Sequence, residues 1–370
     1  MVDYVKLLLL AVAVAWCADH ASRKRTNAGQ RRRLVLCTLV LLVLLAGFAG
    51  LRTRCNDTGV YRHSYEMLTE GSWAASDKQL GSNPLFNWVN CRLKHAGVST
   101  QNFLMFWAFL TVGCYVIFLH CHSVDYPLTV FLLFATGCYP FVFAGIKQAA
   151  AIGIAVIGVM LWLRKKRVLY LLCVMIATLL HPYSLLYLLV PVMQFRPWTY
   201  KTYVLLALAV GCGFLLEPLL GTIVSITAML GEGYSVASFS EAGVNIFRVL
   251  VCNVPTFLSL AYRRQLFTDS SPAENLFVNL TMLNGAIMFV GLFGTANYFA
   301  RLANYFLIFQ SLSLPWMLKK LGGKPRRNLT ILMLLGYTGY FAYANLIAIP
   351  FESDFHRLTV SEYFALLRGR

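Results

Sequence analysis

The sequence predicts an all-α protein, a polytopic bundle of about twelve transmembrane helices. Of its 370 residues, 58% are hydrophobic and only 13% are charged, whereas a soluble domain has roughly 25% charged residues. Many apolar runs of roughly 17–22 residues recur, which is the length that crosses a bilayer. Short basic segments separate several of these runs. Together these features argue against a soluble enzyme.

The net charge of +17 also suggests nucleic acid as a partner, but the distribution of the charge argues against it. Most Lys and Arg residues lie in short segments between apolar runs, as the positive-inside rule predicts for cytoplasmic loops. Such residues set orientation and contact anionic lipid heads. The ten Cys residues contain no C-x-x-C pair, so we expect no metal site and no cofactor.

The first two spans and the segment after them set the orientation. The predicted first span covers residues 2–17, and the arginine-rich loop 18–33 places its end in the cytoplasm. The second span, 34–51, returns outward to an extracytoplasmic segment, 52–100. Two short amphipathic helices are expected in this segment. Their apolar residues recur at helical spacing, namely Tyr61, Tyr65 and Leu68, then Leu85, Val89 and Leu93.

The remaining spans alternate in direction along the chain. They are expected at residues 102–120, 126–144, 149–163, 168–180, 184–195, 203–220, 244–262, 276–294, 302–318 and 330–350. The sixth and seventh spans are short, so we expect a break around His181 and Pro182.

Residues 1–350 are then expected to form a single transmembrane domain. It carries a second extracytoplasmic loop, 221–243, and precedes an amphipathic tail, 351–370. No internal repeat is evident. This weakens a transporter reading, because many transporters consist of inverted halves.

Several polar residues fall at or near the predicted outer side of the membrane. They are Arg52, Arg54, Asp57, Lys147, His181, Glu217, Arg248 and Arg301. Charges beside hydrocarbon are costly and usually functional. We therefore expect Lys147, Arg248 and Arg301 to converge in one pocket and bind a diphosphate, since Arg offers a planar fork of donors and Lys a point charge. The alternative is that the arginines reach lipid heads or pair with Glu217 or Glu241.

Two residues are candidates for the base that activates a sugar hydroxyl. Asp57 is the preferred base, although it is alternatively the ion-pair partner of Arg52 and Arg54. His181 is the second candidate, with a packing or capping role as its alternative. Aromatic rings such as Tyr61, Tyr298 and Tyr305 are suited to stacking on sugars. Cys55 and Cys91 share the first outer segment, where both a disulfide and two free thiols are compatible with the sequence.

Four short elements together resemble the EpsG family of bacterial exopolysaccharide-synthesis membrane proteins, which is related in role to Wzy-type O-antigen and capsule polymerases. They are Arg52, Asp57 and Tyr61 followed by Tyr65; Lys147-Gln148-Ala149-Ala150-Ala151; Leu180-His181; and Arg301 with Tyr305 and Phe306. Their order and spacing agree over most of residues 1–320. Lys147 stands where the family has Arg, and Cys55-Asn56 where it has Gly-Thr.

The resemblance implies a glycosyltransferase of GT-C-like architecture that joins undecaprenyl-diphosphate-linked oligosaccharides at the outer face of the bacterial inner membrane. The residues implied to bind the sugar or support the site are Arg52, Tyr61, Gln148, Glu217 and Tyr305. A chain-length regulator and a flippase are candidate partners. A ligase, a single-sugar transferase and, less favoured, a transporter or flippase remain as alternative functions.

Overall fold

Most of the chain is helical wherever its structure is described. The computed structural model describes residues 2–23, 28–68, 83–230, 243–294, 296–346, 361–362 and 365. No strand occurs among them, which confirms the all-α prediction. The chain divides into two compact units. The first comprises Met1–His122, Tyr139–Leu185 and Ala342–Arg370, and the second comprises Ser123–Cys138 and Leu186–Phe341. The single catalytic domain over 1–350 stays a prediction.

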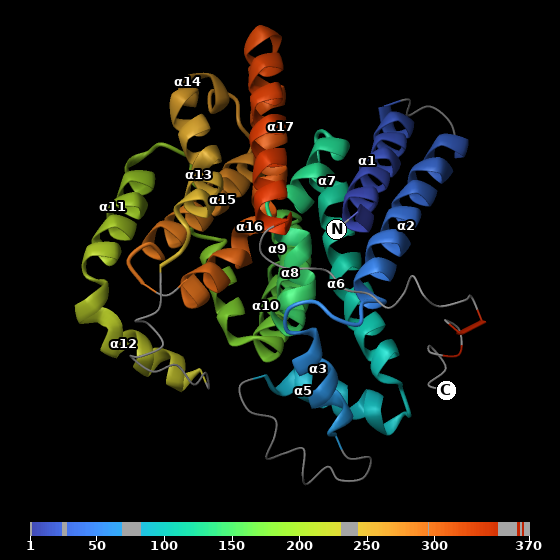
Figure 1. The fold of residues 1–370 in the computed structure, drawn as a ribbon. Helices are drawn as coiled ribbons and strands as arrows, with labels where there is room; N and C mark the ends of the chain where they lie inside the picture. The colour runs from blue at the N-terminus through green and yellow to red at the C-terminus, as the bar shows by residue number, and fades with distance from the viewer. Residues whose placement is uncertain are drawn as a thin grey trace. The chain divides into compact units, whose positions relative to one another are not determined.

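The first unit consists of helical hairpins with two short helices at one end. Its elements are α1 (Val2–Arg23), α2 (Ala28–Gly50), α3 (Thr58–Glu66), α5 (Pro84–His95), α6 (Thr100–His122), α8 (Cys138–Ala144), α9 (Ile146–Leu163) and α10 (Arg167–Leu180). Neighbouring pairs are α1 with α2, α2 with α6, α6 with α9, and α9 with α10 (Figure 1). The short helices α3 and α5 confirm the two amphipathic helices expected after the second span.

Small residues explain the close packing of α9. Ala149, Ala150 and Ala151 are fully buried. A Cβ on Gly153 would lie 3.1 Å from the Cβ of Cys114 on α6, so the two helices approach nearly to backbone contact. Without a strong hydrophobic driving force between helices in lipid, such close van der Waals packing supplies much of their association.

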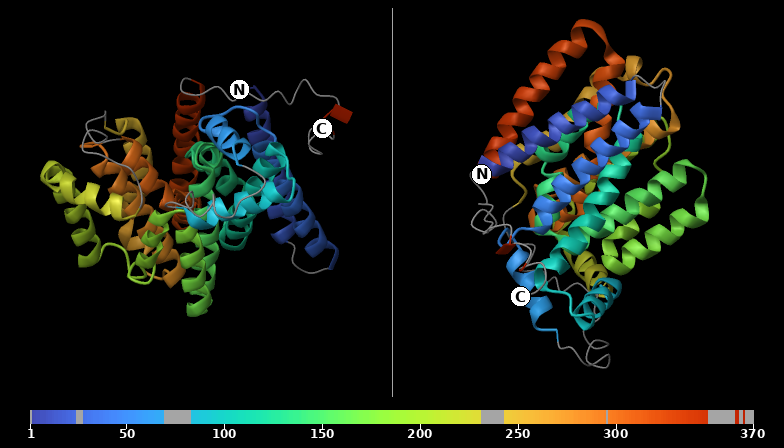
Figure 2. Two further views of the ribbon diagram at one scale, coloured as in Figure 1. Left: turned by 90° about the horizontal axis from the view of Figure 1, so that it is seen from below. Right: turned by 90° about the vertical axis from the view of Figure 1, so that its right-hand side faces the viewer.

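The second unit is built around the α15–α16 hairpin. Its elements are α7 (Tyr126–Ala135), α11 (Tyr200–Phe214), α12 (Leu216–Met229), α13 (Ile246–Ala261), α14 (Arg263–Leu266), α15 (Pro272–Val290), α16 (Ala296–Leu321) and most of α17 (Gly323–Leu346). Helices α11, α13 and α16 all contact α15, and α7 contacts α16 (Figure 2). A capping box starts α15, because the Ser271 hydroxyl accepts from the Glu274 N–H and the Glu274 carboxylate accepts from the Ser271 N–H.

The predicted break at His181 is confirmed. Helix α10 ends at Leu180, and His181 adopts an extended conformation with φ −157° and ψ 121°. Pro182 explains this, because the residue before a proline is disfavoured in the helical region. The chain then enters a 3₁₀ helix, Pro182–Leu189, which covers the first part of the short span expected at 184–195.

Two other predicted spans are bent. The span expected at 126–144 consists of α7 and α8, inclined by 47°, and Gly137 between them has a φ of +88° that other residues rarely adopt. The span expected at 203–220 is divided at Leu215 into α11 and α12, which are inclined by 102°. Helix α12 continues to Met229, so the first part of the loop expected at 221–243 is helical, and its extracytoplasmic placement stays a prediction. Residues 231–242 lie outside the described residues.

Apolar length supports fewer crossings than the sequence pattern suggested. Among the described residues, α6, α9 and α15 are long and apolar enough to cross a membrane, and the count rises to five if each bent pair forms one span. The arrangement of twelve spans therefore stays a prediction, as does the GT-C-like architecture. The expected amphipathic tail, 351–370, lies almost wholly outside the described residues.

Candidate functional site

Arg52 is a buried cation at the end of α2. Its side chain is 1% exposed. Its Nε donates to the Thr58 hydroxyl over 2.8 Å, and a terminal N–H donates to the Ala49 carbonyl. The guanidinium also lies 5.7 Å from the centre of the Phe143 ring on α8. Burial lowers the pKa of Arg52 to about 10, so the side chain remains positively charged at neutral pH.

Gln101 holds the chain around Arg52 in place. Its amide nitrogen donates to the carbonyls of Gly50 (2.5 Å) and Arg52 (3.5 Å), and its amide oxygen accepts from Arg62 on α3 (3.2 Å). The Tyr65 hydroxyl of α3 donates to the Val98 carbonyl over 2.8 Å. These bonds fix α3 against the beginning of α6, directly beside Arg52.

Asp57 and Tyr61 lie at the start of α3. The Asp57 side chain is exposed and makes no capping hydrogen bond, although Asp57 occupies the N-cap position. It forms no ion pair within the described part of the chain, so the alternative of an ion pair with Arg52 or Arg54 is not observed there. The Tyr61 ring makes an edge contact with Phe86 of α5, with centroids 6.1 Å apart. A carboxylate is thus presented at the surface beside the buried Arg52.

Lys147 and Gln148 lie in the first turn of α9. Gln148 is buried and Lys147 is partly buried. The corner before them is tight, because a Cβ on Gly145 would come within 2.8 Å of the Phe141 ring. Phe143, which contacts the Arg52 guanidinium, lies on α8 four residues before Lys147, across the corner at Gly145. Arg52 and the Lys147 corner therefore lie at the same end of the first unit.

His181 lies at this end as well. Helices α9 and α10 form an antiparallel hairpin, in which Gly158 faces Cys173. Because the two helices are antiparallel, residues equally far from that contact lie opposite one another. The start of α9 therefore lies beside the end of α10, where His181 is located. The imidazole is 5% exposed, and its ring centre lies 5.5 Å from that of Tyr183. The first unit thus gathers Arg52, Asp57, Lys147 and His181 at one end.

The second unit brings its two predicted arginines together. Arg248 is the third residue of α13, and its Nη2 donates to the Asn304 side chain on α16 over 3.1 Å. Asn304 follows the exposed Arg301 by about one helical turn. Arg301 is the sixth residue of α16, so the helix begins before the span expected at 302–318. The two guanidinium groups therefore lie at one end of the α13–α16 pair.

A glycine-lined corner sets the position of these arginines. The Val244 N–H, just before α13, donates to the Gly291 carbonyl over 2.7 Å at the end of α15. A Cβ on Gly243 would overlap the carbonyl oxygen of Leu292. A Cβ on Gly294 would overlap Leu216, at the beginning of α12. The starts of α12, α13 and α16 consequently meet around the end of α15.

Tyr305 and Glu217 also fall in this region of the second unit. Tyr305 is fully buried, its ring makes an edge contact with Tyr187, and its carbonyl accepts a 2.6 Å hydrogen bond from the Tyr187 hydroxyl. This environment is compatible with a supporting role for Tyr305 rather than direct stacking on a sugar. Glu217 lies in α12, but its side chain is outside the described part of the structure.

Cys55 and Cys91 are both free thiols in the structure, so the disulfide alternative is not observed. Burial raises the pKa of the Cys55 thiol to about 11, whereas Cys91 is partly exposed. Less of the Cys55 thiol is then ionised near neutral pH than of an exposed thiol, and the thiolate is the form that reacts. We expect a membrane-impermeant maleimide to label a single-Cys91 variant at least tenfold faster than a single-Cys55 variant in intact cells. Equal rates would contradict the burial of Cys55. Labelling of neither variant would contradict the outward placement of 52–100.

The sequence model of the EpsG family matches residues 34–356, which is most of the chain. The protein belongs to the EpsG family. No curated protein and no solved structure matches it.

The EpsG family is associated with polysaccharide polymerisation. Together with the apolar helices α6, α9 and α15, this membership identifies the chain as a polysaccharide polymerase-like membrane protein. The coarse expectation about function is thereby confirmed. Within the described residues, no three His, Cys, Asp or Glu side chains are grouped so that they could hold a metal ion.

Sequence reasoning missed a set of buried amides inside the second unit of this EpsG-family protein. Asn279 donates to the carbonyls of Met193 and Phe195, Asn284 to that of Ala303, and Gln310 to that of Val251. The amide oxygens of Asn279, Asn284 and Gln310 have no hydrogen-bond partner among the described residues. Asn275, Asn279 and Asn284 within one apolar helix were the available signal, because polar side chains in such helices usually join neighbouring helices.

Proposed function

We propose that this EpsG-family protein polymerises undecaprenyl-diphosphate-linked oligosaccharide repeat units at the extracytoplasmic face of the bacterial inner membrane. Its product would be an O-antigen, capsule or exopolysaccharide. The observation that carries the proposal is the Arg248–Asn304 hydrogen bond. Through Asn304, Arg248 comes to the same end of the second unit as Arg301, which supports the proposal that both guanidinium groups contact one anionic group.

The proposed reaction transfers the growing chain to a new repeat unit. A terminal hydroxyl of the acceptor sugar attacks the anomeric carbon of the chain, and the bond from that carbon to the diphosphate oxygen breaks. Undecaprenyl diphosphate leaves with the electron pair, and the hydroxyl proton passes to a base. Arg248 and Arg301 stabilise the negative charge that develops on the leaving diphosphate, because guanidinium forks match phosphate oxygens.

Asp57 is the preferred base in this scheme. Its carboxylate is exposed and makes no capping bond, so a sugar hydroxyl can approach it, whereas His181 is buried. A buried imidazole is better suited to orienting neighbouring groups. Arg52, Tyr61 and Gln148 surround the same end of the first unit and would contact the sugar or support those that do.

Lys147 belongs to the first unit and the two arginines belong to the second. The convergence of all three cations on one diphosphate, and the approach of Asp57 of the first unit to the same substrate, therefore stay predictions. Lys147 replaces an Arg of the family pattern, which keeps the charge but loses the bidentate fork.

Deletion of the gene tests the function. We expect the cells to lose long surface polysaccharide and to accumulate single lipid-linked repeat units that an external sugar-binding probe can reach. Complementation should restore a ladder of lengths. A single added band would instead indicate a ligase or single-sugar transferase, and units trapped on the cytoplasmic side would indicate a flippase. Either result would overturn the polymerase assignment.

A further inference from the structure

A second basic region lies at the opposite end of the second unit. Helix α16 carries Arg301 near its beginning and Lys319 near its end, eighteen residues apart. At 1.5 Å per residue this separation is about 27 Å, close to the thickness of the hydrocarbon core. The positive-inside rule assigns the Lys319 end to the cytoplasm. The region is therefore separate from the proposed polymerase site.

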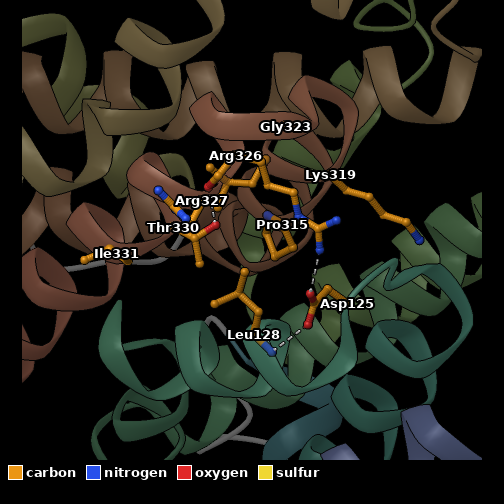
Figure 3. Close-up of a pocket in the computed structure, with 10 residues that line it drawn as sticks. Asp125, Leu128, Pro315, Lys319, Gly323, Arg326, Arg327, Thr330 and Ile331 are labelled. Carbon is orange, nitrogen blue, oxygen red and sulfur yellow. Dashed lines mark hydrogen bonds and ion pairs between the residues drawn. The ribbon is translucent and has the colours of Figure 1, made fainter.

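A cavity of about 320 Å³ opens at this end (Figure 3). Three cationic side chains line it, Lys319 from α16 and Arg326 and Arg327 from the first turns of α17, together with one carboxylate, Asp125. The turn between α16 and α17 depends on Gly322 and Gly323, whose φ values are +65° and +48°. This turn reverses the chain so that both arginines lie beside the end of α16.

The carboxylate is already engaged by the protein. Its Oδ1 accepts from the Leu128 N–H at the start of α7 over 3.3 Å. Its Oδ2 faces an Arg326 guanidinium nitrogen at 3.9 Å, and Figure 3 shows these two side chains pointing toward one another. That separation is longer than a hydrogen bond, and the Arg326 side chain is 46% exposed. The ion pair is therefore weak, and the cavity keeps an excess of positive charge.

Apart from Thr330 and Gly323, the rest of the lining is apolar, and it continues onto a surface suited to lipid. Leu128, Pro315, Leu318 and Ile331 complete the wall. Ile331 is 51% exposed, and the neighbouring α17 residues Leu332 and Leu335 are 66% and 68% exposed. A phosphate in the cavity could thus have acyl chains attached that follow the apolar face of α17. A free phosphate has no acyl chains and would not contact that apolar face.

We propose that this cavity binds the phosphate headgroup of an anionic phospholipid from the cytoplasmic leaflet. Arg326 and Arg327 contact the phosphate oxygens, Lys319 adds a third positive charge, and the acyl chains lie along α17. Basic pockets of this kind between membrane helices suit anionic headgroups. The bound lipid would join α7, α16 and α17 at the end of the unit away from Arg301.

Native mass spectrometry of the full-length protein in detergent tests the proposal. With added phosphatidylglycerol, we expect a lipid adduct that phosphatidylcholine does not form. The double variant R326Q/R327Q should bind phosphatidylglycerol about thirtyfold more weakly, given the contribution of each basic residue near a lipid surface. The matched control R263Q/R264Q removes two exposed arginines from α14, outside the cavity, and should bind nearly as the unmodified protein does.

The possible outcomes separate the proposal from its rivals. Equal weakening in both double variants would mean a general charge effect and would overturn the site. Equal adducts of both lipids would overturn it as well. If inorganic phosphate displaced phosphatidylglycerol at concentrations equal to those of the lipid, the ligand would be a free phosphate and the lipid assignment would fall. Size-exclusion profiles show whether each variant remains folded, and the milder K319Q tests the cavity if R326Q/R327Q does not fold.

Discussion

Arg248→Ala and Arg301→Ala are each expected to stop chain elongation while the protein remains inserted in the membrane. Each substitution removes a guanidinium from the proposed diphosphate site, where charge develops as the leaving group departs. Loss of one such donor typically lowers a rate by about 10²- to 10³-fold. The measurement is the length distribution of surface polysaccharide on a gel, with membrane levels of the protein determined in parallel.

Two controls make the result specific. Arg263→Ala removes an exposed arginine from α14 and should leave the ladder unchanged. Arg248→Lys keeps the charge but removes the planar fork, so elongation should fall less than with alanine. Normal ladders in both alanine variants would remove the diphosphate assignment, whereas loss of the protein from the membrane would assign the arginines a structural role.

Gly243→Ala is expected to abolish chain elongation, because Gly243 lies in the corner between α13 and α15 that determines the position of Arg248. The new Cβ would overlap the carbonyl oxygen of Leu292, and a backbone atom cannot move aside as a flexible side chain can. Val244 and the start of α13 must then shift away from α15, which carries Arg248 away from Asn304. A displacement of about 1 Å in a reacting site costs about a hundredfold in rate, and overpacking typically costs about 1–3 kcal/mol of stability. Both quantities are measurable, by elongation assay and by thermal unfolding in detergent.

Gly211→Ala is the matched control for this prediction. Gly211 lies within α11, and a Cβ there would meet nothing within 4 Å. Alanine in a helix interior is then neutral or stabilising, by up to about 1 kcal/mol. If Gly243→Ala elongated normally and unfolded at the temperature of the unmodified protein, the close approach at this corner would not matter to function.

Local chemistry made several elements predictable from the sequence. The helical spacing of Tyr61 and Tyr65 identified α3, because an amphipathic pattern reports which face is covered. Pro182 identified the end of α10, because the constraint on His181 acts within one residue. The four short elements around Arg52, Lys147, His181 and Arg301 identified the EpsG family, which the match over residues 34–356 confirms.

Apolar length alone misjudged other elements. The run at 203–220 is apolar throughout, yet the helix stops at Phe214 and resumes in another direction at Leu216. Hydropathy does not detect such a bend, because it depends on residue type and not on the direction of the helix axis. The close packing of Gly294 against Leu216 involves residues far apart in the sequence, so no local pattern predicts it.

Composition and periodicity were sufficient to establish a helical membrane protein with basic segments between its apolar runs, since both follow from the preference of each residue for water or hydrocarbon. Which charged side chains lie near one another was determined by the tertiary structure. Arg248 meets Asn304 because α13 and α16 pack together, and Arg52 meets Phe143 because α2 and α8 do. Those contacts depend on the fit of side chains between helices distant in the chain, which only the folded arrangement contains.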